Sequence, residues 1–486
     1  MSWRERLPAE LAREFGVVVL LEGSGTFSVA TAPHATPASL AAARARLGAP
    51  LAPEPVGADR FSLLLTQAYA DDGRTIAAAS APSALAGDAD ADLLAATEGS
   101  GAVELLAQLL RDALAQGASD VHLDAIEQGG RIRRRIDGVL SDVQTVDGAT
   151  HQALVARAKV LANLDLAEKR LPQDGRLRVT IGGRRVDVRV ATLPVQHGER
   201  AVLRLLDSAQ IRLDLDRLGM DARTSEALRA AVAAPHGMVL VTGPTGSGKT
   251  TTLYAAVAGL DRERLNVVSV EDPVEYAMDR VAQTQVNPRI DLDFARALRS
   301  ILRHDPDVII VGEIRDRETA DIAVQASLTG HLVLASLHTN SAGAAVTRLM
   351  DMGVEPYLLA SSLRGVLAQR LVRRLDPLDR LLRSVTPAER ELMCARGADP
   401  AQLPTEVADV SSTMSDRRGG YRGRLGVYRW LPVDRAMAAA IHARAPDAEL
   451  EAHAEAQGWP GLFLDGLRHL RAHEINLSEL LRVTEQ

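Results

Sequence analysis

Short apolar runs separated by helix-like segments dominate the stretch that begins after Pro235. Four of these runs read MVLVT, VVSV, DVIIVG and LVLASLH, and the sequence between them is compatible with helices. Strands that alternate with helical segments in this way are typical of a doubly wound sheet whose strands run parallel. The pattern therefore predicts that residues 214–374 form an α/β domain, the largest domain of the chain.

The sequence before this domain shows a different alternation. VELLAQLLRDALAQG places Leu106 and Leu110 on the apolar face of an amphipathic helix, and Gly117 is positioned to end it. RIRRRIDGVL, RLRVTIGG and RRVDVRVATLPV then alternate apolar and polar residues around glycine turns. These features predict an antiparallel α+β domain over residues 103–213. The RIRRR segment is compatible with a nucleic-acid patch, but its alternation favours a solvated strand face.

The two ends of the chain follow neither pattern. Residues 1–79 combine the apolar runs VVVLL and FSLLL with an alanine-rich helical stretch that starts at Thr36 and Pro37, which predicts a small α/β module. Residues 80–102 are rich in Ala, Ser, Gly and Asp, as expected of a linker. Beyond the α/β domain the sequence becomes helix-like and charged, so residues 375–486 are expected to form a mostly helical subdomain.

Composition narrows the class of protein. The chain has 486 residues, of which 46% are hydrophobic and 24% charged, and this fits a soluble protein of several domains. Its formal net charge of −7 argues against a general nucleic-acid-binding role. The single cysteine, Cys394, excludes a disulfide framework and fits a reducing compartment. The start, MSWRERLPAELAREF, lacks the apolar core of a signal peptide, and no stretch is apolar enough to span a membrane. We therefore expect a cytoplasmic protein that reaches a membrane only through a partner.

The clearest chemical motif lies between the first strand of the α/β domain and a helix-compatible run. Residues 243–250 read GPTGSGKT and satisfy the pattern G-x-x-x-x-G-K-[ST]. Glycines at these positions let backbone N–H groups turn toward phosphates, while Lys249 reaches the β- and γ-phosphates and the Thr250 hydroxyl is placed for Mg²⁺. The predicted ATP-binding residues are Gly243, Pro244, Thr245, Gly246, Ser247, Gly248, Lys249, Thr250 and Thr251.

Carboxylates follow two further predicted strands. DVIIVGE ends at Glu313, where a P-loop enzyme needs an acceptor for Mg²⁺ and its water ligands. VVSVEDPVEY runs into Glu271, Asp272 and Glu275 at the sheet edge that should face the nucleotide. We expect Glu271 to polarise the attacking water, whereas Asp272 and Glu275 are equally compatible with a helix cap or a metal site.

Histidines and arginines near these strands leave alternatives open. His331 and His338 flank the strand in GHLVLASLHT and either brace the sheet or, in the case of His338, sense the γ-phosphate or reach a neighbouring subunit. Arg299 and Arg303 are four residues apart, so on a helix they share one face that can meet a phosphate or an acidic neighbour. Arginines in the strands before the α/β domain are equally ambiguous in isolation.

Taken together, these motifs closely resemble the ATPases of type II secretion and type IV pilus systems. The similarity covers about Val103 to Leu375 and includes GPTGSGKTTTLY, VEDPVEY, the stretch from QTQVNPRIDLDF to LASLHTNSA, and the closing LAQRLVRRL. GASDVHL, RIDG, EKRLPQDGR and HGERAVLRLLD resemble the family's domain before the motor. The resemblance implies a RecA-like P-loop NTPase domain and a homo-hexamer that hydrolyses ATP with Mg²⁺. It also implies a nucleotide-facing set of arginines, namely Arg189, Arg204, Arg299 and Arg303.

The N-terminal module helps to choose within this family. RLPAELAREFGVVVLL, TPASLAAARARLG and DRFSLLLTQAYADD resemble the short module of type II secretion ATPases, whose partner is the cytoplasmic domain of an inner-membrane platform protein. The resemblance implies a motor that is peripherally associated with the inner membrane and drives pseudopilus assembly and protein export across the outer membrane. A type IV pilus assembly ATPase is the alternative. The net charge argues against a DNA translocase, and intact Glu271 and Glu313 argue against a nucleotide-gated scaffold without turnover.

One feature departs from the family pattern. Most relatives hold zinc with two C-x-x-C pairs in the C-terminal part, whereas the matching positions here are Asp376, Asp379, Thr413 and Asp416. Three carboxylates and a hydroxyl do not make a thiolate zinc site. We therefore expect no zinc and a subdomain held by packing and surface charge pairs, with a hard-cation site as the alternative.

Overall fold

The computed structural model describes residues 3–7, 11–12, 15–22, 26–33, 35–56, 61, 101–181, 184–206, 214–411 and 419–485. The predicted strand FSLLL beyond its first residue, and the predicted linker before Gly101, lie outside this range. The chain divides into two compact units, one of residues 1–112, 122–132 and 145–203 and the other of residues 113–121, 133–144 and 204–486. None of the described helices is long and apolar enough to cross a membrane.

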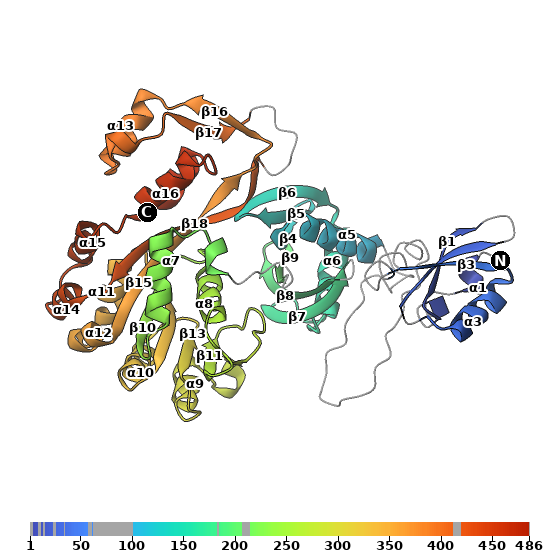
Figure 1. Ribbon diagram of the computed structural model, residues 1–486, viewed down its shortest axis with the longest axis horizontal. Coiled ribbons are helices and arrows are strands. Elements are labelled where there is room, and N and C mark those ends of the chain that lie inside the picture. The colour runs from blue at the N-terminus through green and yellow to red at the C-terminus, as the bar shows by residue number, and fades with distance from the viewer. Residues whose placement is uncertain are drawn as a thin grey trace. The chain divides into compact units, whose positions relative to one another are not determined.

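The described part of the N-terminal module is a small sheet with helices beside it (Figure 1). Its elements are α1 (Trp3–Arg6), β1 (Val17–Glu22), β2 (Phe27–Thr31), α3 (Pro37–Leu47) and β3 (Leu51–Pro55). Strand β2 pairs antiparallel with β1 and parallel with β3. The predicted start of α3 is confirmed, because the Thr36 hydroxyl accepts the Ser39 N–H in a capping box, and Gly48, with φ of +73°, ends the helix.

An α+β part follows, with a six-stranded sheet of order β6-β5-β4-β9-β8-β7. Its elements are α5 (Gly101–Ala115), β4 (Ala118–Ile126), β5 (Gly129–Ile136), β6 (Val139–Val146), α6 (Gly148–Leu161), β7 (Gln173–Ile181), β8 (Arg184–Val195) and β9 (Gly198–Leu206). The predicted amphipathic helix is confirmed, since Leu106 and Leu110 are fully buried. The RIRRR segment is a strand with Arg131 exposed and Arg133 and Arg135 half-buried on one face, as the alternation predicts, while Arg134 is buried beside Ile132 on the other face.

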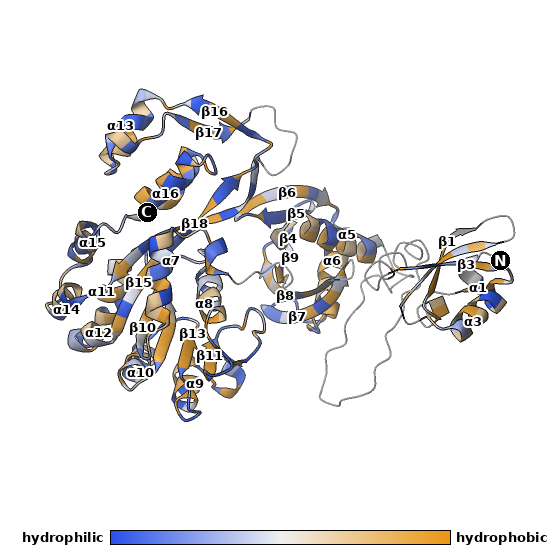
Figure 2. Cartoon of the chain, viewed as in Figure 1, coloured by the Kyte–Doolittle hydropathy of each residue, from blue (hydrophilic) through white to orange (hydrophobic). Residues whose placement is uncertain are grey.

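The largest part is built on a seven-stranded sheet of order β12-β11-β13-β14-β10-β15-β18. Its strands are β10 (Gly237–Thr242), β11 (Val267–Glu271), β12 (Val281–Gln285), β13 (Val308–Val311), β14 (Leu332–Leu337), β15 (Leu363–Leu375) and β18 (Tyr421–Pro432). The first six strands in this order are parallel, and β18 pairs antiparallel with β15. All four predicted apolar runs are buried strands, and the hydrophobic colouring of β10 and β13 is visible in Figure 2.

Helices cover this sheet as its alternating pattern requires. They are η2 (Leu215–Arg217), α7 (Ala222–Val232), α8 (Lys249–Ala258), η3 (Pro288–Ile290), α9 (Phe294–Ile301), α10 (Arg317–Leu328), α11 (Ala342–Asp351) and α12 (Pro356–Ser362). The strands and helices share one hydrophobic core, which includes Leu240, Ile309, Leu334 and Val366. Because β10, β11, β13 and β14 are parallel, the residues that follow their carboxyl ends meet at one edge of the sheet.

The C-terminal part contains β16 (Arg380–Ser384), α13 (Pro387–Ala395), η4 (Pro400–Gln402), β17 (Glu406–Val410), α14 (Arg435–His442), α15 (Asp447–Ala456), α16 (Leu462–Arg471) and α17 (Leu477–Thr484). It is rich in helix, as expected. However, the expectation that sheet strands end at about residue 374 is wrong, because β15 reaches Leu375 and β18 completes the seven-stranded sheet. Strand β18 was missed because its buried segment GVYRWLP contains Arg429, whose charge is neutralised by Glu451 and Glu455.

A hydrophobic core holds the region of the C-terminal part that contains Asp376 and Asp379. A core that includes Val372, Met393, Leu470 and Leu480 lies beneath α13, α16 and α17. Asp376 accepts the Leu378 N–H at 3.0 Å and so caps a turn, and the Asp379 N–H donates to the Asp376 carbonyl at 3.0 Å. Thr413 and Asp416 lie outside the described residues. Within the described part, no group of three or more His, Cys, Asp or Glu residues is arranged to hold a metal ion.

Candidate active site

The phosphate-binding motif forms the loop between β10 and α8. Gly243, Gly246 and Gly248 have φ angles of +152°, +79° and +86°, in the region that favours glycine. A Cβ atom on Gly243 would lie 2.5 Å from the carbonyl oxygen of Gln369, so the loop needs glycine there for space as well. Gly248 precedes the first turn of α8 without a side-chain cap, which leaves helix N–H groups available to an anion.

Lys249 is buried beneath this loop. Its side chain is 8% exposed, and Nζ donates to the carbonyl oxygens of Gly243 at 2.8 Å and Pro244 at 3.2 Å. Burial lowers the pKa of Lys249 to about 8, against the opposing attraction of Glu313. Nζ also lies 3.4 Å from Nδ1 of His338. The lysine is therefore held ready at the loop by carbonyl groups that a phosphate can replace.

A chain of polar contacts joins this lysine to the carboxylate at the end of β13. His338 follows β14 directly and uses its two ring nitrogens differently. Nδ1 faces Lys249, and Nε2 lies 2.9 Å from Oε2 of Glu313. Arg315 contacts Glu313 and lies 3.1 Å from Oδ2 of Asp272. The hydrogen bond with Glu313 raises the pKa of Arg315. The structure thus brings together the residues that follow β10, β11, β13 and β14.

The two histidines of the GHLVLASLHT segment have different surroundings. The ring of His331 lies 3.0 Å from the carbonyl oxygen of Ala326, within the turn that leads into β14. His338 is 47% exposed and is the link between Lys249 and Glu313. Bracing of the sheet therefore describes His331, while His338 borders the phosphate-binding loop.

Glu271 lies in a buried network. Its side chain is 3% exposed and accepts hydrogen bonds from the Tyr254 hydroxyl, from Ser269 Oγ at 2.6 Å and from Gln283 Nε2 at 3.1 Å. Burial, together with the neighbouring carboxylate, raises the pKa of Tyr254. These contacts tie α8, β11 and β12 together. The polar chain described above includes Glu313 and Asp272, whereas the hydrogen bonds of Glu271 join it to buried residues of α8, β11 and β12.

The predicted nucleotide-facing arginines have local partners in this structure. Arg299 pairs with Glu318, and Arg303, which lies beyond the end of α9, donates to the Arg299 carbonyl at 2.9 Å. The prediction of one shared helical face for the two is therefore wrong at the helix end. Arg204 Nε lies 2.8 Å from Oδ1 of Asp120, and its side chain is 58% exposed. Arg189 is a half-buried residue of β8, opposite Arg176 in the strand register.

Two residues that border the loop were not singled out by sequence reasoning. The side-chain amide of Gln369, on β15, donates to the Ser247 carbonyl at 2.6 Å and accepts from the Thr252 hydroxyl at 2.8 Å. Arg370, next to it, is 4% exposed. Both residues stand out as polar positions within the apolar strand segment LAQRLVRRL. Such a pattern does not indicate which polar side chains face a ligand.

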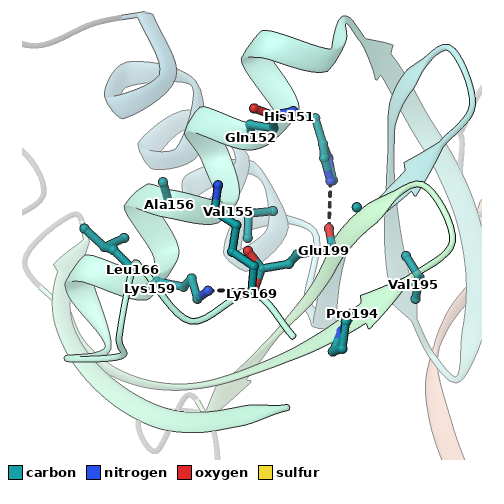
Figure 3. A pocket seen from close by; sticks show the side chains of 11 residues that line it. His151, Gln152, Val155, Ala156, Lys159, Leu166, Lys169, Pro194, Val195 and Glu199 are labelled. Carbon is teal, nitrogen blue, oxygen red and sulfur yellow. Dashed lines mark hydrogen bonds and ion pairs between the residues drawn. The ribbon is translucent and has the colours of Figure 1, made fainter. Parts of the chain in front are cut away.

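A separate cavity of about 290 Å³ lies in the α+β part (Figure 3). It is lined partly by His151, Lys159 and Glu199, and Figure 3 shows the two interactions made by Glu199. Lys159 Nζ lies 2.6 Å from Oε1 of Glu199, and His151 Nε2 lies 2.9 Å from the Glu199 carbonyl oxygen. Lys159 and Glu199 form an ion pair in this cavity, and Lys169 also lines it.

Comparison with known proteins agrees with this geometry. The family described as type II/IV secretion system protein matches residues 96–482. Type II secretion system ATPase E of Vibrio cholerae is 49% identical over 395 residues, 81% of this chain and 78% of the relative. Type II secretion system protein E of Pseudomonas aeruginosa is 44% identical over 493 aligned residues, 99% of this chain and 96% of the relative.

Two solved structures share the fold. The pilus retraction motor PilT with bound ADP matches with a TM-score of 0.53 and 24% identity, covering 78% of this chain and 97% of that one. The ATPase DotB of Legionella pneumophila matches with a TM-score of 0.56 and 20% identity, covering 79% and 95%. At these identities the likeness concerns the fold, a mixed α/β structure with a largely parallel sheet.

Proposed function

This chain belongs to the type II/IV secretion system protein family, and from that premise we propose that it works as a hexameric motor on the cytoplasmic side of a type II secretion system. The chain is an ATPase and a homologue of the type II secretion system ATPase E. One relative is 44% identical over nearly the whole chain, and another is 49% identical over most of it. The motor would drive pseudopilus assembly and protein export across the outer membrane, while remaining peripheral to the inner membrane.

The observation that carries the proposal is the contact chain from Lys249 through His338 to Glu313 at the carboxyl edge of the parallel sheet. ATP would place its phosphates on the N–H groups of residues 243–251, with Lys249 exchanging loop carbonyl oxygens for phosphate oxygens. The Thr250 hydroxyl and the Glu313 carboxylate are oxygen donors of the kind that Mg²⁺ prefers, so the donor set fits this ion. Bound there, Mg²⁺ would neutralise charge on the phosphate oxygens.

Two carboxylates compete for the role of orienting the attacking water. Glu271 was expected from its place in the strand β11, but its carboxylate is 3% exposed and already accepts three hydrogen bonds from buried donors. Glu313 is 14% exposed and faces His338 and Arg315, which are themselves at the loop edge. We therefore assign water orientation to Glu313 and a positioning role for α8 and β11 to Glu271.

The proposed hexamer supplies the remaining positive charge. Arg189, Arg204, Arg299 and Arg303 would approach the nucleotide when domains or neighbouring subunits close, as cations that stabilise phosphoryl transfer do in other P-loop enzymes. Residues 1–79 would bind the cytoplasmic domain of an inner-membrane platform protein. Relatives that match 99% of this chain, and therefore include this module, are type II secretion proteins, which favours that system over pilus assembly.

The central test is Lys249→Ala, with Lys169→Ala as the matched control. Lys169 is exposed, so its removal should leave hydrolysis unchanged. We expect Lys249→Ala to abolish ATP hydrolysis and to retain the circular dichroism spectrum of the wild type. Hydrolysis near the wild-type rate in this variant would refute the P-loop assignment. Two assays separate the proposal from its alternatives. Binding to a type II platform domain but not to a pilus platform domain would argue against a pilus assembly ATPase, and ATPase rates unchanged by DNA would argue against a DNA translocase.

A further inference from the structure

Strand β15 forms a second wall of the phosphate-binding loop. Gln369 joins the C-terminal part of the loop to α8, because its side-chain amide donates to the Ser247 carbonyl and accepts from the hydroxyl of Thr252 in α8. Gln369 is 1% exposed, so this clamp is shielded from water. The residue that follows Gln369 is thereby fixed in position relative to the loop.

That residue, Arg370, is a buried cation whose partners are all uncharged. Its guanidinium donates to the carbonyl oxygens of Gln369 at 3.2 Å and Asn340 at 2.8 Å, and lies 3.4 Å from Oδ1 of Asn340. Its Nε atom is buried without a hydrogen-bond partner. Among the described residues, no carboxylate lies within ion-pair distance of Arg370.

Two other arginines of the same strand pair, one buried and one half-buried, do have carboxylate partners. Arg429 on β18 is equally buried and pairs with Glu451 and Glu455. Arg373 on β15 pairs with Glu479 at 2.9 Å. A buried charge without a counterion opposes folding, so a protein normally supplies one from its own side chains. Arg370 has no such carboxylate partner among the described residues.

Arg370 also lies in the electrostatic environment of Lys249. Its positive charge contributes to the lowered pKa of Lys249, and burial lowers the pKa of Arg370 itself. Asn340, its hydrogen-bond partner, follows His338 by two residues, and His338 joins Lys249 to Glu313. Two buried cations with neutral partners therefore border one edge of the sheet, on the side where Glu313 would meet the attacked phosphate.

We propose that Arg370 is a second phosphate-binding cation of this site and that the terminal phosphate of ATP is its missing counterion. The inference rests on the proposed function and extends it, because it predicts discrimination between ATP and ADP by a residue of β15. When ATP binds, the guanidinium exchanges a carbonyl contact for a phosphate oxygen. Since β15 pairs with β18 along most of its length, the exchange also reports nucleotide state to the C-terminal part.

The test compares Arg370→Gln and Arg370→Met with Arg373→Gln as the matched control on the same strand. Melting temperature is measured without nucleotide, and dissociation constants are measured for a non-hydrolysable ATP analogue and for ADP, each with Mg²⁺. Both Arg370 variants should melt at or above the wild-type temperature, because an uncompensated buried charge has been removed. Affinity for the ATP analogue should fall at least about ten-fold, and affinity for ADP less than about three-fold.

The control should respond in the opposite way. Arg373→Gln breaks an ion pair with a buried carboxylate, so its melting temperature should fall while its ratio of ATP to ADP affinity stays at the wild-type value. Lower melting of both Arg370 variants with an unchanged ratio would overturn the inference, and so would failure of both to fold. Loss of nucleotide binding in Lys249→Ala, alongside that result, would leave the proposed function standing.

Discussion

Separate replacement of Glu313 and Glu271 by glutamine tests which carboxylate handles water. Glutamine keeps the shape of the side chain but removes its charge and its capacity to accept a proton. For Glu313→Gln we expect nucleotide binding to persist and hydrolysis to fall by about 10²–10⁴, the usual contribution of a positioned acid–base group. For Glu271→Gln we expect hydrolysis to fall by less than about ten-fold, accompanied by a loss of stability.

The size of that loss follows from the contacts of Glu271. Ser269 and Gln283 both donate to Oε1, so a glutamine oxygen placed there keeps these two hydrogen bonds. The amide nitrogen then replaces Oε2, which accepts from Tyr254, and one charge-assisted hydrogen bond worth about 1.5–3 kcal/mol is lost. Relief of the buried charge offsets part of this, so the net cost is about 1–2 kcal/mol, or about 2–8 °C in melting temperature for a domain of this size.

Steady-state ATPase rates, binding of a fluorescent ATP analogue and thermal melts of both variants provide the measurements. The reasoning requires that the two variants separate, one losing turnover and the other losing stability. If Glu271→Gln lost turnover by about 10²–10⁴ at an unchanged melting temperature, while Glu313→Gln remained active, the assignment would be reversed. Glu271 would then be the water-orienting residue predicted from the sequence.

Four further predictions concern other parts of the chain. Because the pKa of Lys249 is lowered to about 8, the nucleotide-free lysine loses its proton above that pH, so ATP affinity should weaken above pH 8 in titrations of the wild type but not of Lys249→Arg. The pKa of Glu389 is lowered to about 2, chiefly by its hydrogen bonds with Arg383, so its charge stabilises the fold at pH 7 and this contribution declines as pH falls from the unfolded pKa toward 2. Glu389→Gln should therefore lower the melting temperature at pH 7, and the difference from the wild type should shrink as pH approaches 2. Elemental analysis should find no stoichiometric zinc, and chelators should leave the melting temperature unchanged; one zinc per chain would contradict this. Specific activity should rise with protein concentration or on fusion to a hexameric scaffold, and Arg204→Ala should remove most of the rise; a flat dependence would show that one chain is catalytically complete.

Where a motif dictates backbone geometry, sequence reasoning located it to the residue. The glycines of residues 243–248 were predictable because all three have φ angles that favour glycine, and Gly243 and Gly248 also lie close to Gln369. The four central strands were predictable because both faces are buried, which requires continuous apolar runs. Strand β12 escaped detection because VAQTQ is a half-exposed edge strand with little apolar signal.

Side-chain direction at the strand ends was not predictable in the same way. Glu271 and Glu313 both come at the ends of apolar strands, and the sequence assigned them different roles without showing which side chain is buried. The structure separates them through their neighbours, since Glu271 meets donors from α8 and β12, whereas Glu313 meets Arg315 and His338. Contacts between segments that are distant in the chain decide such cases, and a single sequence does not contain them.

The state of the cations around the loop links these results to assembly. Lys249 rests on loop carbonyl oxygens, Arg315 on Glu313 and Asp272, Arg299 on Glu318 and Arg204 on Asp120. Each must exchange its local partner before it can stabilise charge on a transferring phosphoryl group. The Arg299–Glu318 pair is exposed on both sides, so breaking it costs only about 0–1 kcal/mol. Asp120, the partner of Arg204, is 5% exposed but also lies 3.8 Å from Arg135, which can partner it when Arg204 leaves. In the hexamer that we propose, a closing neighbour that positions a nucleotide phosphate would supply the new partner, so we expect hydrolysis to be slower in the isolated chain than in the ring.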